Sequence, residues 1–129
     1  FVEIGDWKAP WNQQIKPDKK DAKLSWIEQP KTINEIGSTF TVQGFDLNYV
    51  GVIIGPSVKY RNGKIIYDIS ESKNKGAVQN RKLENGEKVN YGEILLRNEL
   101  NVLLTRGVNG LYIFAVDEEL REVLKKAVK

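Results

Sequence analysis

The chain has 129 residues, contains neither cysteine nor histidine, and carries a formal net charge of +3. Without cysteine it has no disulfide, thiolate metal site or cysteine nucleophile, and without histidine it lacks the commonest general base and zinc ligand. The length fits one domain with a real hydrophobic core, and the small net charge requires any nucleic-acid binding to come from local basic patches.

The first thirty residues differ from the rest in composition. They contain all three tryptophans and three of the four prolines. This predicts an irregular aromatic lead-in over residues 1–30 that packs on a body formed by residues 31–129. No apolar run approaches the roughly 20 residues that cross a bilayer, and no signal-peptide pattern opens the chain, so we expect a soluble cytoplasmic protein without a membrane partner. Because the chain lacks methionine and begins at Phe1, we also expect it to be part of a longer protein.

A β-prone stretch, Ser38 to Val42, opens the regular part of the chain. It leads through a turn or short helix, residues 43–48, into the apolar run Val50 to Ile54. An unbroken apolar run of this length predicts a strand that is covered on both faces.

A hairpin and a polar insertion are predicted next. The segments Val58 to Arg61 and Lys64 to Tyr67 are joined by Asn62-Gly63. Asn-Gly supplies the positive φ values of a type I′ turn, so these segments predict a β-hairpin. Residues 70–90 are polar and rich in lysine, and a loop of this length inside a compact domain is usually functional or disordered.

Basic residues are concentrated on this hairpin and insertion, which together span about residues 57–90. They are Lys59, Arg61, Lys64, Lys73, Lys75, Arg81, Lys82 and Lys88. With Tyr60 or Tyr67 to stack on bases, they fit a surface that follows phosphates. Interleaved carboxylates weaken this interpretation, and a solvated surface is the simpler alternative.

An amphipathic helix is predicted after the insertion. Asn90 and Glu93 resemble a capping box, and Gly107 is a typical stop signal, so we expect the helix to end at Arg106. Its apolar stripe consists of Leu96, Leu100 and Leu103.

A second apolar strand, Leu111 to Val116, precedes the last predicted helix. Asp117 is a suitable N-cap for that helix, with acidic residues in its first turn and lysines near its end. Its apolar face consists of Leu120, Val123, Leu124, Ala127 and Val128. The order strand, helix, strand, helix predicts an α/β fold with a parallel sheet and right-handed crossovers.

Arg106 is the first candidate site residue. It lies between the predicted helix and Gly107, where its planar guanidinium can stabilise charge on a transferring phosphoryl group. The alternative is an arginine that only interacts with the helix dipole, and Thr105 is then an ordinary helix residue.

Gln43-Gly44 is the second candidate. We expect it at the carboxyl edge of the sheet, where open α/β folds bind ligands. There Gln43 suits a phosphate or nucleic-acid backbone, and Asp46 suits a ribose hydroxyl. A glycine turn with solvated polar neighbours is the alternative.

Two further site classes find no support. Asp68, Glu71 and Asp117 have no spacing typical of metal ligands, so no metal site is predicted. The chain also contains no G-x-x-x-x-G-K-[ST] run, and therefore cannot hold a triphosphate in the P-loop manner.

Two blocks, taken as an ordered pair, resemble motifs V and VI of superfamily 1 helicases. The first is Thr39-Phe-Thr-Val-Gln-Gly-Phe-Asp46 with the strand after it, and the second is Val102-Leu-Leu-Thr-Arg106 with the strand after it. With the lead-in Lys8-Ala-Pro-Trp-Asn12, the resemblance covers nearly the whole chain. The chain is thus similar to the second, C-terminal RecA-like domain of a superfamily 1 helicase, in the bacterial helicase-like family grouped with the Schlafen helicase domain.

The resemblance implies a RecA-like fold of the P-loop NTPase type, with three layers, a mainly parallel sheet and an inserted hairpin. It implies that Gln43, Gly44 and Asp46, as motif V, and Thr105 and Arg106, as motif VI, contact the nucleotide. Arg106 is then the catalytic arginine that approaches the γ-phosphate.

The resemblance also implies nucleic-acid contacts from Ser38, Thr39, Phe40 and Thr41. Phe40 stands where many relatives carry histidine, a departure that affects the usual nucleic-acid contact at that point.

The function that the resemblance implies is the C-terminal motor domain of an ATP-dependent DNA or RNA helicase or translocase. ATP and Mg²⁺ are then held mainly by a preceding RecA-like P-loop domain in cis, and the isolated chain is expected to be inactive. The alternatives are a noncatalytic nucleic-acid or protein-binding module with the same fold, and a nuclease. A nuclease requires a carboxylate cluster with a catalytic lysine, and the sequence offers no convincing one.

Overall fold

A computed structural model describes residues 1–13 and 15–128 of the chain. The residues form two compact units, Phe1–Asp46 and Leu47–Lys129, which are described separately.

The first unit contains short elements around a buried carboxylate. They are β1 (Val2–Ile4), β2 (Trp7–Ala9), the 3-10 helices η1 (Trp26–Glu28) and η2 (Pro30–Asn34), and α1 (Thr39–Val42). Strands β1 and β2 pair as an antiparallel hairpin, so the lead-in is more regular than the sequence predicts. Glu35 is buried and accepts hydrogen bonds from Trp26 Nε1 at 2.6 Å and from the Gln13 amide at 2.9 Å. Trp26 is therefore a packing anchor that satisfies Glu35.

The β-prone stretch at Ser38 to Val42 is a helix, and the strand prediction is wrong there. The Ser38 amide donates to Thr41 Oγ1 at 2.8 Å, and Thr41 Oγ1 donates to the Ser38 carbonyl at 2.9 Å. This reciprocal cap starts α1, and local capping of this kind outweighs the preference of threonine and valine for strands. Gly44 follows α1 with a φ of 86°, the left-handed conformation that commonly ends a helix.

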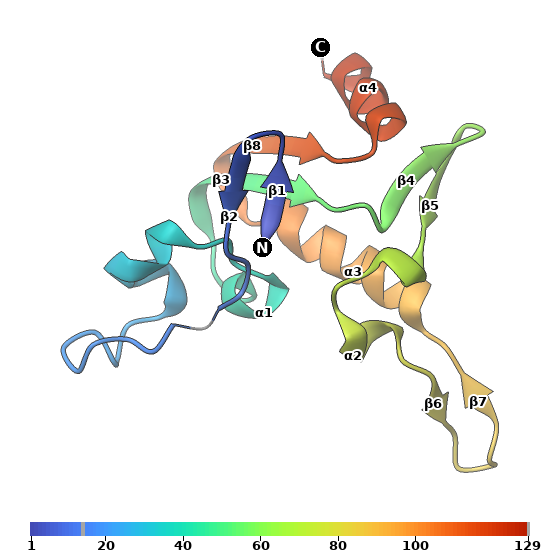
Figure 1. Ribbon diagram of the computed structural model, residues 1–129, viewed down its shortest axis with the longest axis horizontal. Helices are drawn as coiled ribbons and strands as arrows, with labels where there is room; N and C mark the ends of the chain where they lie inside the picture. The colour runs from blue at the N-terminus through green and yellow to red at the C-terminus, as the bar shows by residue number, and fades with distance from the viewer. Residues whose placement is uncertain (14, 129) are drawn as a thin grey trace. The chain divides into compact units, whose positions relative to one another are not determined.

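The second unit is built on two parallel strands, β3 (Leu47–Ile54) and β8 (Gly107–Ala115), which lie side by side (Figure 1). Both predicted strands are confirmed, and each begins a few residues earlier than predicted. One face of the pair is buried through Val52 and Ile54, whereas Gly51 on the other face is exposed. The expectation that both faces are covered is wrong at this position, because an apolar run does not tell which face of a strand is packed.

The predicted hairpin is confirmed as β4 (Val58–Arg61) and β5 (Lys64–Tyr67). Asn62 and Gly63 form its turn with φ values of 50° and 77°, as the Asn-Gly pair predicts.

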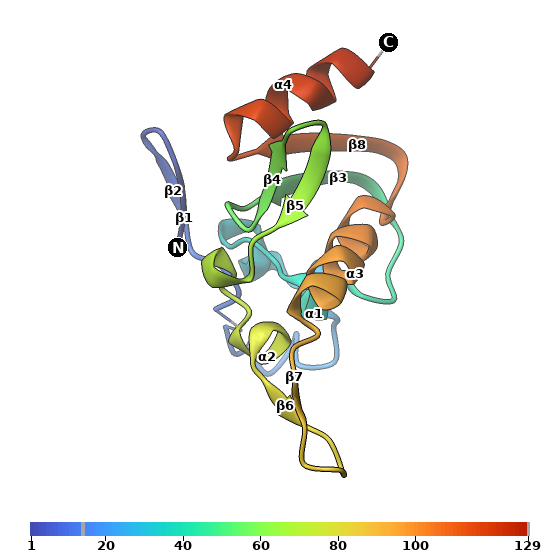
Figure 2. The same cartoon turned by 90° about the vertical axis from the view of Figure 1, so that its right-hand side faces the viewer.

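The polar insertion contains more structure than its composition indicates. It folds into η3 (Ile69–Glu71), α2 (Lys75–Val78), β6 (Arg81–Lys82) and β7 (Lys88–Val89). Strands β6 and β7 pair antiparallel as a hairpin that projects beyond the amino end of α3, which both views show (Figures 1 and 2).

Helix α3 (Gly92–Leu104) carries the predicted leucine stripe into the core, but its ends differ from the prediction. Its N-cap is Tyr91, without a side-chain cap, so the predicted capping box is wrong. Asn90 Oδ1 instead accepts from the Gly92 amide at 2.8 Å. The helix ends at Leu104, two residues before the predicted end. Gly107 begins β8, and a side chain there would collide with the Gly110 carbonyl oxygen.

Helix α4 (Glu118–Ala127) begins at the predicted N-cap, where the Asp117 carboxylate accepts from the Leu120 amide at 3.0 Å. The core of this unit is formed by Val52, Ile54, Val58, Ala115 and Leu120. Leucines of α3 and Leu124 of α4 pack against it. Of the predicted apolar face, Val128 is 79% exposed, because the helix ends one residue before it. Within residues 1–13 and 15–128, no helix has the length and apolar character needed to span a bilayer.

Candidate functional site

Thr105 and Arg106 lie together at the carboxyl end of α3. Thr105 Oγ1 donates to the Asn101 carbonyl at 2.7 Å. Arg106 is half-buried, and among its contacts Nε donates to the Val102 carbonyl at 3.1 Å and Nη2 donates to Thr105 Oγ1 at 3.2 Å. Both side chains therefore satisfy carbonyl groups of the last turn of α3, which would otherwise lack partners.

The sheet fixes the position of the Arg106 backbone. The Leu47 amide donates to the Arg106 carbonyl at 2.8 Å, and Leu47 lies opposite Gly107 in the parallel register. Arg106 thus lies at the amino end of the β3–β8 pair, with its side chain directed back over α3.

The motif V candidates belong to the first unit. Gln43, Gly44 and Asp46 are all exposed, and the Gln43 amide donates to the Thr39 carbonyl at 2.9 Å to close α1. All three precede the amino end of β3 in the chain, so the predicted place at the carboxyl edge of the sheet is wrong. The error follows from taking α1 for a strand.

The four predicted nucleic-acid residues occupy two kinds of position on α1. Ser38 is buried, and its Oγ donates to Asn12 Oδ1 at 2.9 Å. Thr41 takes part in the cap of α1 with Ser38. Phe40 is 69% exposed and Thr39 is half-buried, so these two side chains are more accessible to a ligand than Ser38.

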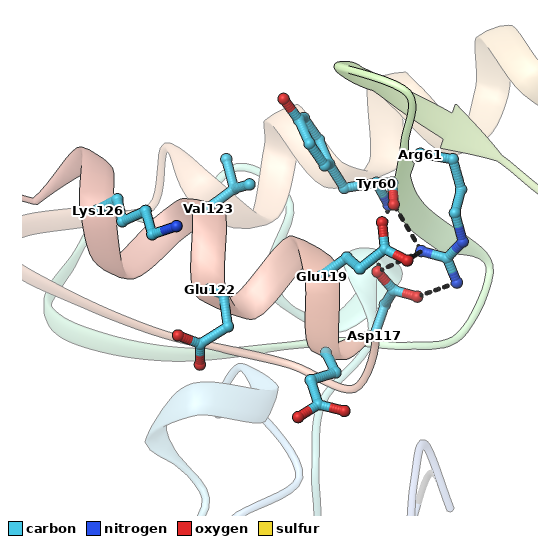
Figure 3. Close-up of a pocket in the computed structure, with 8 residues that line it drawn as sticks. Tyr60, Arg61, Asp117, Glu119, Glu122, Val123 and Lys126 are labelled. Carbon is cyan, nitrogen blue, oxygen red and sulfur yellow. Dashed lines mark hydrogen bonds and ion pairs between the residues drawn. The ribbon is translucent and has the colours of Figure 1, made fainter.

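A different region of the second unit contains an open pocket of about 480 Å³ (Figure 3). Its lining residues are Tyr60, Arg61, Asp117, Glu118, Glu119, Glu122, Val123 and Lys126. Four carboxylates face two cations, so the pocket carries a negative charge and does not suit a phosphate. It follows the carboxyl end of β8, roughly 30 Å along that strand from Arg106 at about 3.3 Å per residue.

An ion pair forms one wall of this pocket. Arg61 Nη2 lies 2.8 Å from Asp117 Oδ1, and Arg61 Nη1 lies 3.0 Å from Oδ2, which is a bidentate contact (Figure 3). The Asp117 side chain is only 7% exposed. Its hydrogen bond from Arg61, supported by the amides of Leu120 and Tyr60, lowers the pKa of Asp117 well below its usual range despite burial. The wall is therefore a charged clamp between β4 and α4.

The structure brings Thr105 and Arg106 together, and likewise Ser38 and Thr41. It also joins Arg61 to Asp117 across 56 positions of sequence. The sequence analysis missed this pair, because Asp117 has a sufficient local explanation as an N-cap and no local pattern indicates its distant partner. Within the part of the chain that the structure describes, no group of three or more acidic side chains is arranged to hold a metal ion.

Comparison with known proteins gives one family and one curated relative. A family model described as "Schlafen group 3, DNA/RNA helicase domain" matches residues 1–117. The uncharacterized protein YPL245W of Saccharomyces cerevisiae is 39% identical over 134 residues, which cover all of this chain and 28% of the relative. The chain thus spans less than a third of the length of this relative. No solved structure matches the chain.

Proposed function

The chain belongs to the family of the Schlafen group 3 DNA/RNA helicase domain and is thus a helicase-related module. We propose that it is the second, RecA-like motor domain of an ATP-driven helicase or translocase. In this proposal a P-loop domain elsewhere in a longer protein binds ATP and Mg²⁺, and this chain closes on it. Bound ATP supplies the phosphoryl group, and this chain supplies the arginine that approaches it.

The placement of Arg106 is the observation that carries the proposal. Its backbone is fixed at the end of the parallel pair by the Leu47 amide, while its side chain rests on the last turn of α3. A guanidinium on a rigid anchor can exchange bonds with helix carbonyls for bonds with a phosphate without any movement of the backbone. Such an arginine stabilises the charge on the transferring group, and elsewhere contributes about 10³ to 10⁵ in rate.

The segment before β3 is the proposed link to nucleic acid. Gly44 and Asp46 are proposed to approach the nucleotide, and Gln43 to contact either the nucleotide or the strand. Thr39 and Phe40 are accessible on α1 and are the side chains best placed to touch a strand. Ser38 and Thr41 have a structural role in the cap of α1, and their contribution is to hold Phe40 in position.

One observation favours a second candidate function, a noncatalytic nucleic-acid-binding module. Arg106 and Thr105 both bond to α3, which is sufficient to explain why these residue types occur there. In such a module Arg106 contributes to stability and not to hydrolysis.

Nucleic-acid-stimulated ATP hydrolysis by the longer protein that contains this chain tests the motor proposal. Arg106→Ala is expected to lower hydrolysis by about 10² or more while nucleotide binding is largely kept, because the arginine acts on the transition state. Arg106→Lys is expected to recover little, since an ammonium lacks the planar fork.

Arg97→Ala is the matched control, because Arg97 is an exposed arginine of the same helix, α3, that lies outside both motif blocks and outside the β6–β7 hairpin. Its rate of hydrolysis at saturating nucleic acid is expected to equal that of the unaltered protein. If the Arg106→Ala protein hydrolyses ATP as fast as the unaltered protein, or if none of the four proteins hydrolyses ATP, the motor is rejected and the noncatalytic module is supported.

A further inference from the structure

The structure divides the basic residues of the hairpin and insertion into two groups. Lys59 is paired with Asp68 at 2.8 Å and Arg61 with Asp117, and these partners raise the pKa of both cations. The three cations of the β6–β7 hairpin differ. Arg81, Lys82 and Lys88 are exposed and, like Lys64, Lys73 and Lys75, have no ion pair or side-chain hydrogen bond within the described residues. Lys59 and Arg61 are thus occupied by the fold, whereas the hairpin cations are available to a ligand.

The register of the hairpin places two of these cations face to face. Lys82 lies directly opposite Lys88, so both side chains leave the same face of the ribbon. Residues opposite each other in an antiparallel pair have Cβ atoms about 5 Å apart, and like charges at that separation destabilise the pair. A two-stranded hairpin is marginally stable in water, so this arrangement weakens an element that has little stability to lose. An anion between the two ammonium groups removes the repulsion.

The hairpin lies in a basic segment of the chain. Residues 73–90 contain five cations and two carboxylates, a net charge of +3 that equals the formal net charge of the whole chain. One of the two carboxylates, Glu87, accepts from Asn85 Nδ2 at 3.2 Å within the turn. Lys73 and Lys75 precede the projecting ribbon (Figure 2), which carries the other three cations and both carboxylates, a net charge of +1.

The hairpin has a well-anchored root. Asn90 Nδ2 donates to the Val78 carbonyl and to Asn80 Oδ1, each at 2.9 Å, and Asn90 Oδ1 accepts from the Gly92 amide. One side chain thus joins the two ends of the hairpin to the first residue of α3. A ligand bound to the hairpin is therefore connected directly to α3 through these hydrogen bonds.

We propose that the β6–β7 hairpin is a second nucleic-acid contact, in which Lys82 and Lys88 together hold the phosphodiester backbone of a strand. Arg81 flanks the pair on the other face. The inference rests on the proposed function for the class of partner, and extends it to a surface outside both motif blocks. Recognition is through phosphate charge, so DNA and RNA strands share this chemistry.

Equilibrium binding of single-stranded oligonucleotides to the longer protein that contains this chain tests the inference. Fluorescence anisotropy with DNA and RNA of one sequence is measured over a series of salt concentrations. The double variant Lys82→Gln/Lys88→Gln is expected to bind about tenfold more weakly, with a salt slope reduced by about 1.4. Lys82→Arg/Lys88→Arg is expected to bind as the unaltered protein does, because the charges are kept. Weakening with both DNA and RNA supports a backbone contact, and weakening with one only identifies that strand as the partner.

Lys19→Gln/Lys20→Gln is the matched control, because it removes two exposed lysines and the same charge from the other unit. It is expected to change neither affinity nor slope. The thermal midpoint of the Lys82→Gln/Lys88→Gln protein is expected to be unchanged or raised, since a repulsion is lost; a lowered midpoint would assign the lysines to stability and overturn the inference.

The inference is also overturned if the hairpin variant binds normally, if the control weakens binding equally, or if the protein binds vesicles with anionic lipid but no oligonucleotide. None of these readouts requires ATP hydrolysis. If Arg106→Ala lowers hydrolysis but the hairpin variant binds normally, only this inference is rejected. If the hairpin variant binds weakly but Arg106→Ala leaves hydrolysis unchanged, only the motor is rejected.

Discussion

Asp117 connects α4 to β4 through one carboxylate. It caps α4 at the Leu120 amide, accepts from the Tyr60 amide at 3.2 Å, and forms the bidentate contact with Arg61. A residue type chosen for a helix start thus also fastens the β4–β5 hairpin to α4. Burial of this carboxylate is tolerated because each oxygen has a donor.

Asp117→Ala is expected to lower the free energy of unfolding by about 1 to 2 kcal/mol from the lost cap alone, and by more if the Arg61 contact contributes. Asp117→Asn keeps an N-cap and removes the charge, so it isolates the ion pair. Urea denaturation of both variants, each with and without Arg61→Gln, measures the coupling. A coupling of zero would show that Arg61 is not part of the clamp.

The lowered pKa of Asp68 predicts that its contribution to stability depends on pH. Its hydrogen bond from Lys59, followed by that from the Ser70 hydroxyl, lowers its pKa from 3.8 to about 2. Because the folded-state pKa is the lower one, this contribution is present above pH 4 and is lost as the pH falls toward 2. Unfolding measured from pH 5 to pH 2 is expected to show a shallower decline for Asp68→Asn than for the unaltered protein. Parallel curves would contradict the assignment.

At the scale of elements, local signals predict the hairpin and the last helix well. Asn62-Gly63 and Asp117 each combine one residue type with one local geometry, and both predictions are confirmed. The predicted start of α3 was wrong for a different reason. Asn90 carries the hydrogen bonds of a cap, but it uses them to join the hairpin to the helix, and this depends on Val78, twelve residues away.

Gly92 at the start of α3 provides a test of this junction. A Cβ there would lie 2.8 Å from Ile69 Cγ2 and from Asn90 Oδ1, and 3.3 Å from Val78 Cα. Gly92→Ala is therefore expected to destabilise the protein by about 1 to 3 kcal/mol through overpacking, although alanine is ordinarily the better helix residue by about 1 kcal/mol.

Gly76→Ala in α2 is the control for this change, since its Cβ would meet only Asn74 Oδ1 at an ordinary 3.5 Å. It is expected to be neutral or stabilising in the same denaturation measurement. If Gly92→Ala behaves like the control, the junction is looser than its contacts indicate.

At the scale of the whole molecule, the order of strands and helices was predictable and their contacts were not. The apolar periodicities predict β3, β8, α3 and α4, whereas the register of β3 against β8 comes from the structure alone. The division after Asp46 has no compositional signal, since the predicted change of character falls at residue 30. The Arg61–Asp117 clamp depends on which surfaces meet after folding, and single-sequence patterns do not contain that information.

In the candidate site, too, local features were predictable from the sequence and contacts between distant residues were not. Thr105 and Arg106 were placed together from sequence because they are neighbours at a helix end. The cap formed by Ser38 and Thr41 was missed, because β-propensity was weighted above capping. The basic insertion was taken as one patch, and only the ion partners of Lys59 and Arg61 separate its occupied cations from the available ones.

Helix α3 begins at the root of the β6–β7 hairpin and ends beside Thr105 and Arg106 (Figure 2). Each residue of a helix advances its axis by about 1.5 Å and turns it by about 100°. A residue added at the tip of the hairpin only lengthens the ribbon. A residue added inside α3 would rotate the ribbon about the helix axis by about 100° relative to Arg106. The thirteen residues of α3 therefore fix both the distance and the rotation between the hairpin and Arg106. We therefore expect a one-residue insertion at the tip of the hairpin to be tolerated and one inside α3 to be destabilising.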